Sequence, residues 1–200
     1  MKKKRLSFLT LSLLGVVSLF GQTIRPLAEL PSGLEFDPSY ALMYNMRFKD
    51  SLGNHALVLL RSQRRSEEGA ETIVLKAMQF RQDSTSWVGE WEIKDWVDCE
   101  GLDIAGDFDV GLTAISDLDS NGIMETTIAY KLVCAGGVEP KTTKVVMRQG
   151  KMKYAVRGES MVKIGENSSY GGTYSADPIL DEKPEFRRFL VEKWKASANY

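Results

Sequence analysis

The chain has 200 residues, of which 43% are hydrophobic and 10% aromatic. This length and composition fit a single domain with a hydrophobic core of its own. The 26 basic and 27 acidic residues leave a formal net charge of -1. The basic footprint that nucleic-acid binding requires is absent, so we expect no nucleic-acid partner.

Residues 1–21 have the layout of a secretory signal peptide. Four basic residues, Lys2 to Arg5, precede an apolar stretch from Leu6 to Phe20, and the small Gly21 follows. The stretch is shorter than the roughly 20 residues of a bilayer span, and a retained N-terminal anchor is the alternative. Cleavage after Gly21 removes four basic residues and leaves 22 against 27 acidic ones, a net charge of about -5. We expect export to the periplasm, the cell surface or the medium, with no transmembrane span in the mature chain.

Residues 22–40 contain three prolines and no periodicity, which predicts an irregular lead-in. From residue 41 onward, strand-like runs alternate with turn residues, as in the hairpin predicted around "KDSLGN". The predicted strands occupy residues 41–48, 55–62, 71–80, 86–96, 141–149 and 152–158. The fold class is therefore mostly β, with antiparallel sheets forming a sandwich or a partial propeller within a single domain, residues 41–200.

The segment "SWVGEWEIKDW" alternates well between apolar and polar positions, which predicts a strand with one buried face. One face is expected to carry Trp87, Trp91 and Ile93. The opposite face is expected to carry Glu90, Glu92 and Lys94.

The C-terminal region changes character after Gly165. The segment "GENSSYGGTYSADP" is polar and rich in glycine, which predicts a mobile loop. Residues 183–197 then read as a helix, with Pro184 in its first turn. Its apolar stripe, formed by Phe186, Phe189, Leu190 and Trp194, predicts packing onto a sheet, and docking to a partner protein is the alternative.

Two cysteines, Cys99 and Cys134, are present. In an exported protein such a pair favours a disulfide, which would stabilise the fold by roughly 3–4 kcal/mol. Two free, buried thiols are the alternative. Alternation in "IMETTIAYKLVC" places Cys134 on the core side of its predicted strand and Glu125 on the polar side.

The segment "DLDSNGIMET", from Asp117 to Thr126, has the ligand spacing of a calcium loop. Side-chain oxygens would come from Asp117, Asp119 and Asn121, and a backbone carbonyl from Ile123. The glutamate that closes an EF-hand is replaced by an apolar residue and the flanks are strands, so Glu125 is the expected fifth ligand. A tight turn built from ordinary turn residues is the alternative. We expect any bound calcium to be structural, because no nucleophile or base lies nearby in the sequence.

Several segments carry a resemblance to a known family: "KDSLGNHALVL", "WEIKDWVDC", "ISDLDSNGIMETTIAYKLVC", "KYAVRG" and "KPEFRRFLVEKW". The block from Asp117 to Cys134 is the most specific. On these segments the chain resembles a family of small exported bacterial proteins named "surface polysaccharide biosynthesis protein". The resemblance implies an exported β-rich protein linked by name to cell-surface glycans, and it brings no catalytic residues. Residues 22–40 and the segment "EGLDIAGDFDVG" match least.

Signals for an enzyme are weak in this sequence. The single histidine, His55, follows Asn54 in a predicted turn, which favours a surface position. Neither a nucleophile elbow nor a phosphate-binding loop is present. Four acids near two tryptophans could serve a glycosidase or a sugar-binding face, although the same alternation suits aromatic residues that pack inward. These acids are Glu90, Glu92, Asp95 and Asp98.

We therefore predict no catalytic residues. The expected function is an exported, calcium-stabilised β-domain that acts as a binding or structural component at the cell envelope, with a glycan or an envelope protein as partner. The alternative is an enzyme or accessory factor that acts on surface polysaccharide. Exposure of Trp87, Trp91 and Trp96 in a cleft with convergent carboxylates would favour the alternative.

Overall fold

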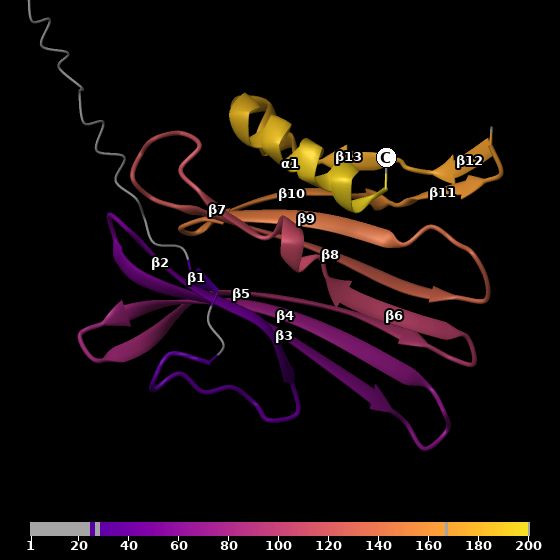
Figure 1. Cartoon of the computed structure of the whole chain (residues 1–200), viewed down its shortest axis with the longest axis horizontal. Helices are drawn as coiled ribbons and strands as arrows, with labels where there is room; N and C mark the ends of the chain where they lie inside the picture. Colours follow the sequence, from indigo (N-terminus) through magenta and orange to yellow (C-terminus); the bar gives the residue numbers. More distant parts are fainter. Residues whose placement is uncertain (1–24, 27–28, 167, 200) are drawn as a thin grey trace, which may run out of the picture.

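The computed structural model describes residues 25–26, 29–166 and 168–199, and the predicted signal peptide lies outside them. Two antiparallel sheets face each other, and one helix near the C-terminus lies on the outer side of the second sheet (Figure 1). The predicted fold class is confirmed, and the arrangement is a sandwich rather than a partial propeller.

The first sheet is a meander of consecutive strands in the order β1-β2-β3-β4-β5. Its strands are β1 (Arg25–Pro26), β2 (Ala41–Asp50), β3 (Gly53–Arg65), β4 (Glu71–Asp83) and β5 (Ser86–Cys99). The β2–β3 turn has the predicted position. Asp50 Oδ1 accepts the Leu52 N–H at 2.7 Å, and Gly53 has a φ of 129°, which favours glycine there.

The second sheet has the order β13-β10-β9-β8-β6, and β7 also pairs with β8. Its strands are β6 (Asp103–Phe108), β7 (Ala114–Ser116), β8 (Glu125–Ala135), β9 (Thr142–Gln149), β10 (Met152–Glu159) and β13 (Tyr174–Ala176). The remaining elements are η1 (Val110–Leu112), the hairpin of β11 (Met161–Ile164) with β12 (Ser168–Gly171), η2 (Pro178–Glu182) and α1 (Pro184–Ser197).

The main core lies between the two sheets. Alternation places Leu57, Leu59 and Ile73 of the first sheet against Ile128 and Tyr130 of the second, all at most 4% exposed. On the outer side of the first sheet, a smaller cluster includes Leu34 and Tyr40 from the end of the lead-in. The lead-in thus covers part of a sheet face that would otherwise meet solvent.

Helix α1 covers the outer face of the second sheet, as its apolar stripe predicted. Phe186, Leu190 and Trp194 are completely buried, whereas Phe189 is only partly buried. The Trp194 indole N–H donates to the Thr143 carbonyl at 3.0 Å, which fixes the helix over β9. The predicted helical range, residues 183–197, differs from the observed one by a single residue, because Lys183 is the N-cap.

Two local predictions were wrong. The polar segment after Gly165 contains strands β12 and β13, because its backbone pairs with β11 and β10. Trp87 and Trp91 lie on opposite faces of the sheet, because a β-bulge interrupts β5: Gln79 pairs with Trp91 but Phe80 with Gly89. The extra residue in this bulge is Glu90.

Disulfide Cys99–Cys134 is confirmed, with a Cα–Cα distance of 5.3 Å. Cys99 is the last residue of β5 and Cys134 lies near the end of β8. The bond therefore joins the two sheets covalently at one end of the sandwich.

Candidate metal centre

The loop between β7 and β8 is closed by the side chain of Asp117. Its two carboxylate oxygens accept the backbone N–H groups of Asn121 at 3.0 Å and Gly122 at 3.1 Å. Ser120 and Gly122 have φ values of 56° and 78°, so the chain reverses sharply within the loop. This reversal carries Asp119 back toward the start of β8.

Three of the predicted ligands meet at this loop. Asp117, Asp119 and Glu125 each offer a carboxylate oxygen, and these oxygens lie within 4.8 Å of one another. The three residues could therefore hold a metal ion. The pattern of alternate acids around one glycine was sufficient to identify them, because all three belong to one local turn.

Glu125 lies on the face of β8 opposite the core residues Ile128 and Tyr130, as its strand parity predicted, and it is fully buried there. This outer face of the second sheet is covered, because α1 packs on it. Burial raises the pKa of the Glu125 carboxyl, and the Asp119 carboxylate raises it further. Hydrogen bonds from the Leu118 N–H at 2.8 Å and the Ser116 hydroxyl at 3.1 Å oppose this shift.

Two side chains distant in sequence also reach the carboxylates. Gln149, the last residue of β9, donates its amide to Glu125 Oε1 at 2.7 Å and to both oxygens of Asp119 at 3.1 and 3.2 Å. Lys183 Nζ, at the start of α1, lies 3.3 Å from Asp119 Oδ2. The sequence analysis missed both residues, because neither belongs to the loop.

The other two predicted ligands remain predictions. Asn121 lies beside the cluster, where its Nδ2 donates to Asp119 Oδ2 at 3.2 Å. Its Oδ1 accepts the Ile123 N–H at 2.7 Å. These contacts hold the loop in shape.

The loop is tied to the opposite sheet through the β2–β3 turn. The Ser51 N–H donates to the Gly122 carbonyl at 2.8 Å, and Asp50 Oδ2 accepts the Met124 N–H at 3.2 Å. The acidic cluster therefore lies where the two sheets and the start of α1 contact one another, a region called the joint below.

Next to this joint lies a buried histidine that the sequence analysis had placed on the surface. His55 is 1% exposed, because its parity in β3 is that of the core residues Leu57 and Leu59. Its Nε2 lies 2.8 Å from Asp50 Oδ1 and its Nδ1 lies 2.9 Å from Glu90 Oε2. An ionised carboxylate only accepts hydrogen bonds, so with both acids ionised both ring nitrogens donate and the ring is an imidazolium.

The pKa of His55 reflects these opposing effects. Burial lowers it, but the hydrogen bonds to Glu90 and Asp50 and the charges of both carboxylates raise it above the ordinary value. From Glu90 the network continues across the core. Gln79 donates to Glu90 Oε2 at 2.8 Å, and the Thr126 hydroxyl donates to Gln79 at 2.7 Å.

The acids proposed for a glycosidase do not converge. Glu90 binds His55, and the other three have separate partners: Glu92 with Lys76 at 3.5 Å, Asp95 with Lys144 at 2.5 Å, and Asp98 with the Thr72 hydroxyl at 2.6 Å. Trp91 is buried, Trp87 is half-buried and Trp96 is 57% exposed. The three tryptophans therefore do not line one cleft.

No protein-family model matches the chain, and no curated protein or solved structure is significantly similar to it. Within the described ranges, no helix has the length and hydrophobicity required to cross a membrane. The function must therefore be argued from the site itself.

Proposed function

We propose that the chain is an exported β-sandwich stabilised by one calcium ion at the β7–β8 loop, and that it acts as a non-catalytic binding or structural component at the cell envelope. The convergence of the Asp117, Asp119 and Glu125 carboxylates is the observation that carries this proposal. Its link to surface polysaccharide rests on the family resemblance alone.

The donor chemistry favours calcium. Carboxylate and carbonyl oxygens are the hard ligands that calcium prefers, and it takes about six to eight of them. Three carboxylates at this spacing repel one another, and Lys183 supplies one positive charge against them. A divalent cation would offset the remaining repulsion. Rotation of the Gln149 amide would replace its donor with an oxygen, which could serve as a further ligand.

The position of the loop favours a structural role for the ion. The carboxylates come from the β7–β8 loop, whose backbone is bonded to the β2–β3 turn, and Gln149 and Lys183 bring in β9 and the start of α1. An ion here would strengthen the contact between both sheets and the helix. The disulfide at the Cys99 end of the sandwich and the signal-like N-terminus support an exported setting.

Thermal unfolding in calcium, magnesium and EDTA tests the proposal. An ion that binds only the folded state stabilises it by RT ln(1 + [Ca]/Kd), or about 2.7 kcal/mol at a hundredfold excess over Kd. We expect a higher Tm in millimolar calcium than in EDTA, and a smaller effect of magnesium.

Asp119→Asn should remove the difference between calcium and EDTA. Asp83→Asn, which changes an exposed acid in the β4–β5 turn, is the matched control and should keep it. Identical melting curves in calcium and EDTA for the unmutated chain would refute the calcium site.

A further inference from the structure

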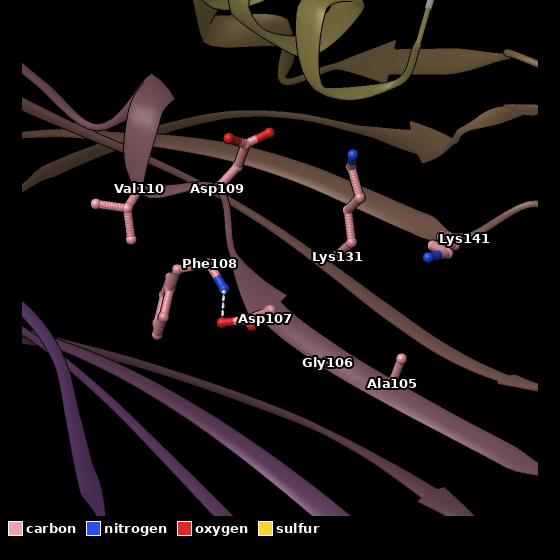
Figure 2. A pocket seen from close by; sticks show the side chains of 8 residues that line it. All are labelled: Ala105, Gly106, Asp107, Phe108, Asp109, Val110, Lys131 and Lys141. Atoms are coloured by element: carbon pink, nitrogen blue, oxygen red, sulfur yellow. Dashed lines mark hydrogen bonds between the residues drawn. The ribbon is translucent and has the colours of Figure 1, made fainter.

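A pocket of about 250 Å³ lies beside β6, below α1 in the view of Figure 2. The residues that matter for its chemistry are Asp107, Phe108, Asp109, Val110, Lys131 and Lys141. Most of the wall comes from the segment "EGLDIAGDFDVG", the part of the chain that the family resemblance matches least. The pocket is separate from the acidic loop.

Apolar and charged residues of the pocket lie on different sides of the second sheet. Phe108 packs into the core between the sheets, and in Figure 2 Phe108 and Val110 point toward the first sheet, whereas Asp109 and Lys131 point toward α1. Asp107 and Lys131 are directly paired across β6 and β8. The charged side chains thus belong to the rim of the pocket.

The backbone around the pocket is held firmly. Lys141 donates its N–H to the Ser160 hydroxyl at 2.9 Å, and its carbonyl accepts the Ser160 N–H at 2.8 Å. On the helix side, burial lowers the pKa of Lys193 and the Asp109 carboxylate opposes this shift.

The four rim charges form no ion pair within 4.0 Å among the described residues. Nine ion pairs are found among the described residues, and none involves Asp107, Asp109, Lys131 or Lys141. The Asp107 carboxylate accepts the neighbouring Phe108 N–H at 2.9 Å. Two ammonium groups and two carboxylates therefore surround one concave site with most of their hydrogen-bonding capacity unused.

This combination selects against simple ligands. A bare anion such as phosphate would be attracted by the lysines but repelled by Asp107 and Asp109. A metal cation would be repelled by two ammonium groups, and a neutral sugar would bring no negative charge to offset theirs. A ligand with one carboxylate and several hydroxyl groups satisfies both sets, because ammonium groups bind the carboxylate and aspartates accept from hydroxyls.

We propose that this pocket binds one carboxylated sugar residue, the chemistry of a uronic acid. Lys131 and Lys141 hold the sugar carboxylate, and Asp107 and Asp109 accept its hydroxyl groups. The small volume suits one sugar ring. The inference rests on the proposed binding role at the envelope and names the class of ligand for it.

Titration of the purified chain with glucuronate, followed by calorimetry and amide NMR shifts, tests the proposal. We expect saturable binding, with shifts at residues 105–110 and 131. Glucose and acetate, each of which carries half of the recognised chemistry, should bind at least about tenfold more weakly. Lack of saturable glucuronate binding at millimolar concentrations, or equal binding of acetate, would overturn the proposal.

The double substitution Lys131→Gln with Lys141→Gln should weaken glucuronate binding by about tenfold or more. The matched control is Lys151→Gln with Lys153→Gln, which changes two exposed lysines near the β9–β10 turn. This control should leave glucuronate binding unchanged. Asp109→Asn should weaken glucuronate but leave acetate unchanged. Equal affinity of all variants for glucuronate would place the binding elsewhere and refute the site.

An oligogalacturonide compared with free glucuronate distinguishes the sources of the ligand. Tighter binding of the oligomer assigns the site to a polysaccharide, and equal binding assigns it to a single sugar acid; both support the pocket. Each titration is repeated in calcium and in EDTA. If glucuronate binds but calcium does not raise the Tm, the calcium site alone is refuted. If calcium raises the Tm but glucuronate does not bind, the pocket alone is refuted.

Discussion

The Nδ1 atom of His55 lies 2.9 Å from Glu90 Oε2, although the two residues are 35 positions apart. The β-bulge in β5 makes this contact possible, because Glu90 is the residue without a partner in β4. The imidazole ring stacks on the ring of Phe48, with ring centroids 4.9 Å apart, and this contact fixes its orientation. The result is a charged group inside the sandwich that is paired on both of its nitrogens.

This arrangement predicts that stability falls as the pH rises above 6.5. The pKa of His55 is raised above its ordinary 6.5, so its contribution is complete below that value and is lost as the pH rises through the folded-state pKa. The pKa of Glu90 is lowered because its bonds to His55 and Gln79 and nearby charges outweigh burial. Its contribution is complete above about 4.5 and is lost as the pH falls through the folded value.

Urea unfolding across about pH 5 to 9 measures this dependence. His55→Gln should destabilise the protein, because it leaves Asp50 and Glu90 without their shared cation, and should flatten the decline above neutral pH. His55 is the single histidine in the chain, so its imidazole NMR signals report the protonation state without overlap. An imidazole that titrates below 6.5 in the folded protein would contradict the prediction.

Glu125 gives the metal loop a pH dependence of its own. Its raised pKa means that, without a metal, the stabilising contribution is complete below the ordinary 4.5 and is lost as the pH rises through the folded value. In EDTA, the stability of Glu125→Gln relative to the unmutated chain should therefore increase as the pH rises. Unfolding midpoints of both proteins at acid and neutral pH measure this difference. In calcium the variant should lose the metal-dependent stabilisation. A variant that still responds to calcium like the unmutated chain would remove Glu125 from the site.

The Cys99–Cys134 bond should contribute about 2–5 kcal/mol to the free energy of unfolding. Replacement of both cysteines by serine should lower the urea midpoint by a corresponding amount. Reductant should lower the midpoint of the unmutated chain and leave the double-serine variant unchanged. Thiol titration of the unfolded, unreduced protein should find no free thiol, and two reactive thiols would show that the bond does not form.

Trp194 should be the residue on α1 most sensitive to truncation. It is completely buried and its indole N–H bonds to the Thr143 carbonyl, so Trp194→Ala should cost about 3–5 kcal/mol. Phe189→Ala, on the partly exposed side of the same helix, is the control and should cost clearly less. Denaturant unfolding compares the two, and equal losses would mean that α1 does not pack on the sheet through this face.

Local patterns in the sequence were sufficient to predict most of the secondary structure, the acidic loop and the disulfide. The alternation of apolar residues predicted most of the long strands, and the spacing of Phe186 and Trp194 predicted the helix and its buried face. The acids of the β7–β8 loop were found because a turn brings neighbouring residues together. The cysteine pair was found because two cysteines in a chain predicted to be exported leave one intramolecular pairing.

Only the tertiary structure decided the contacts that depend on the packing of distant strands. It buried His55, and it brought Glu90 to His55 because a bulge reversed the alternation that the sequence suggested for β5. It also brought Gln149 and Lys183 to the acidic loop and placed Lys141 beside β6. Alternation fixes which side of a strand a residue occupies, but it carries no information about which distant residue faces it across a sheet or beneath a helix.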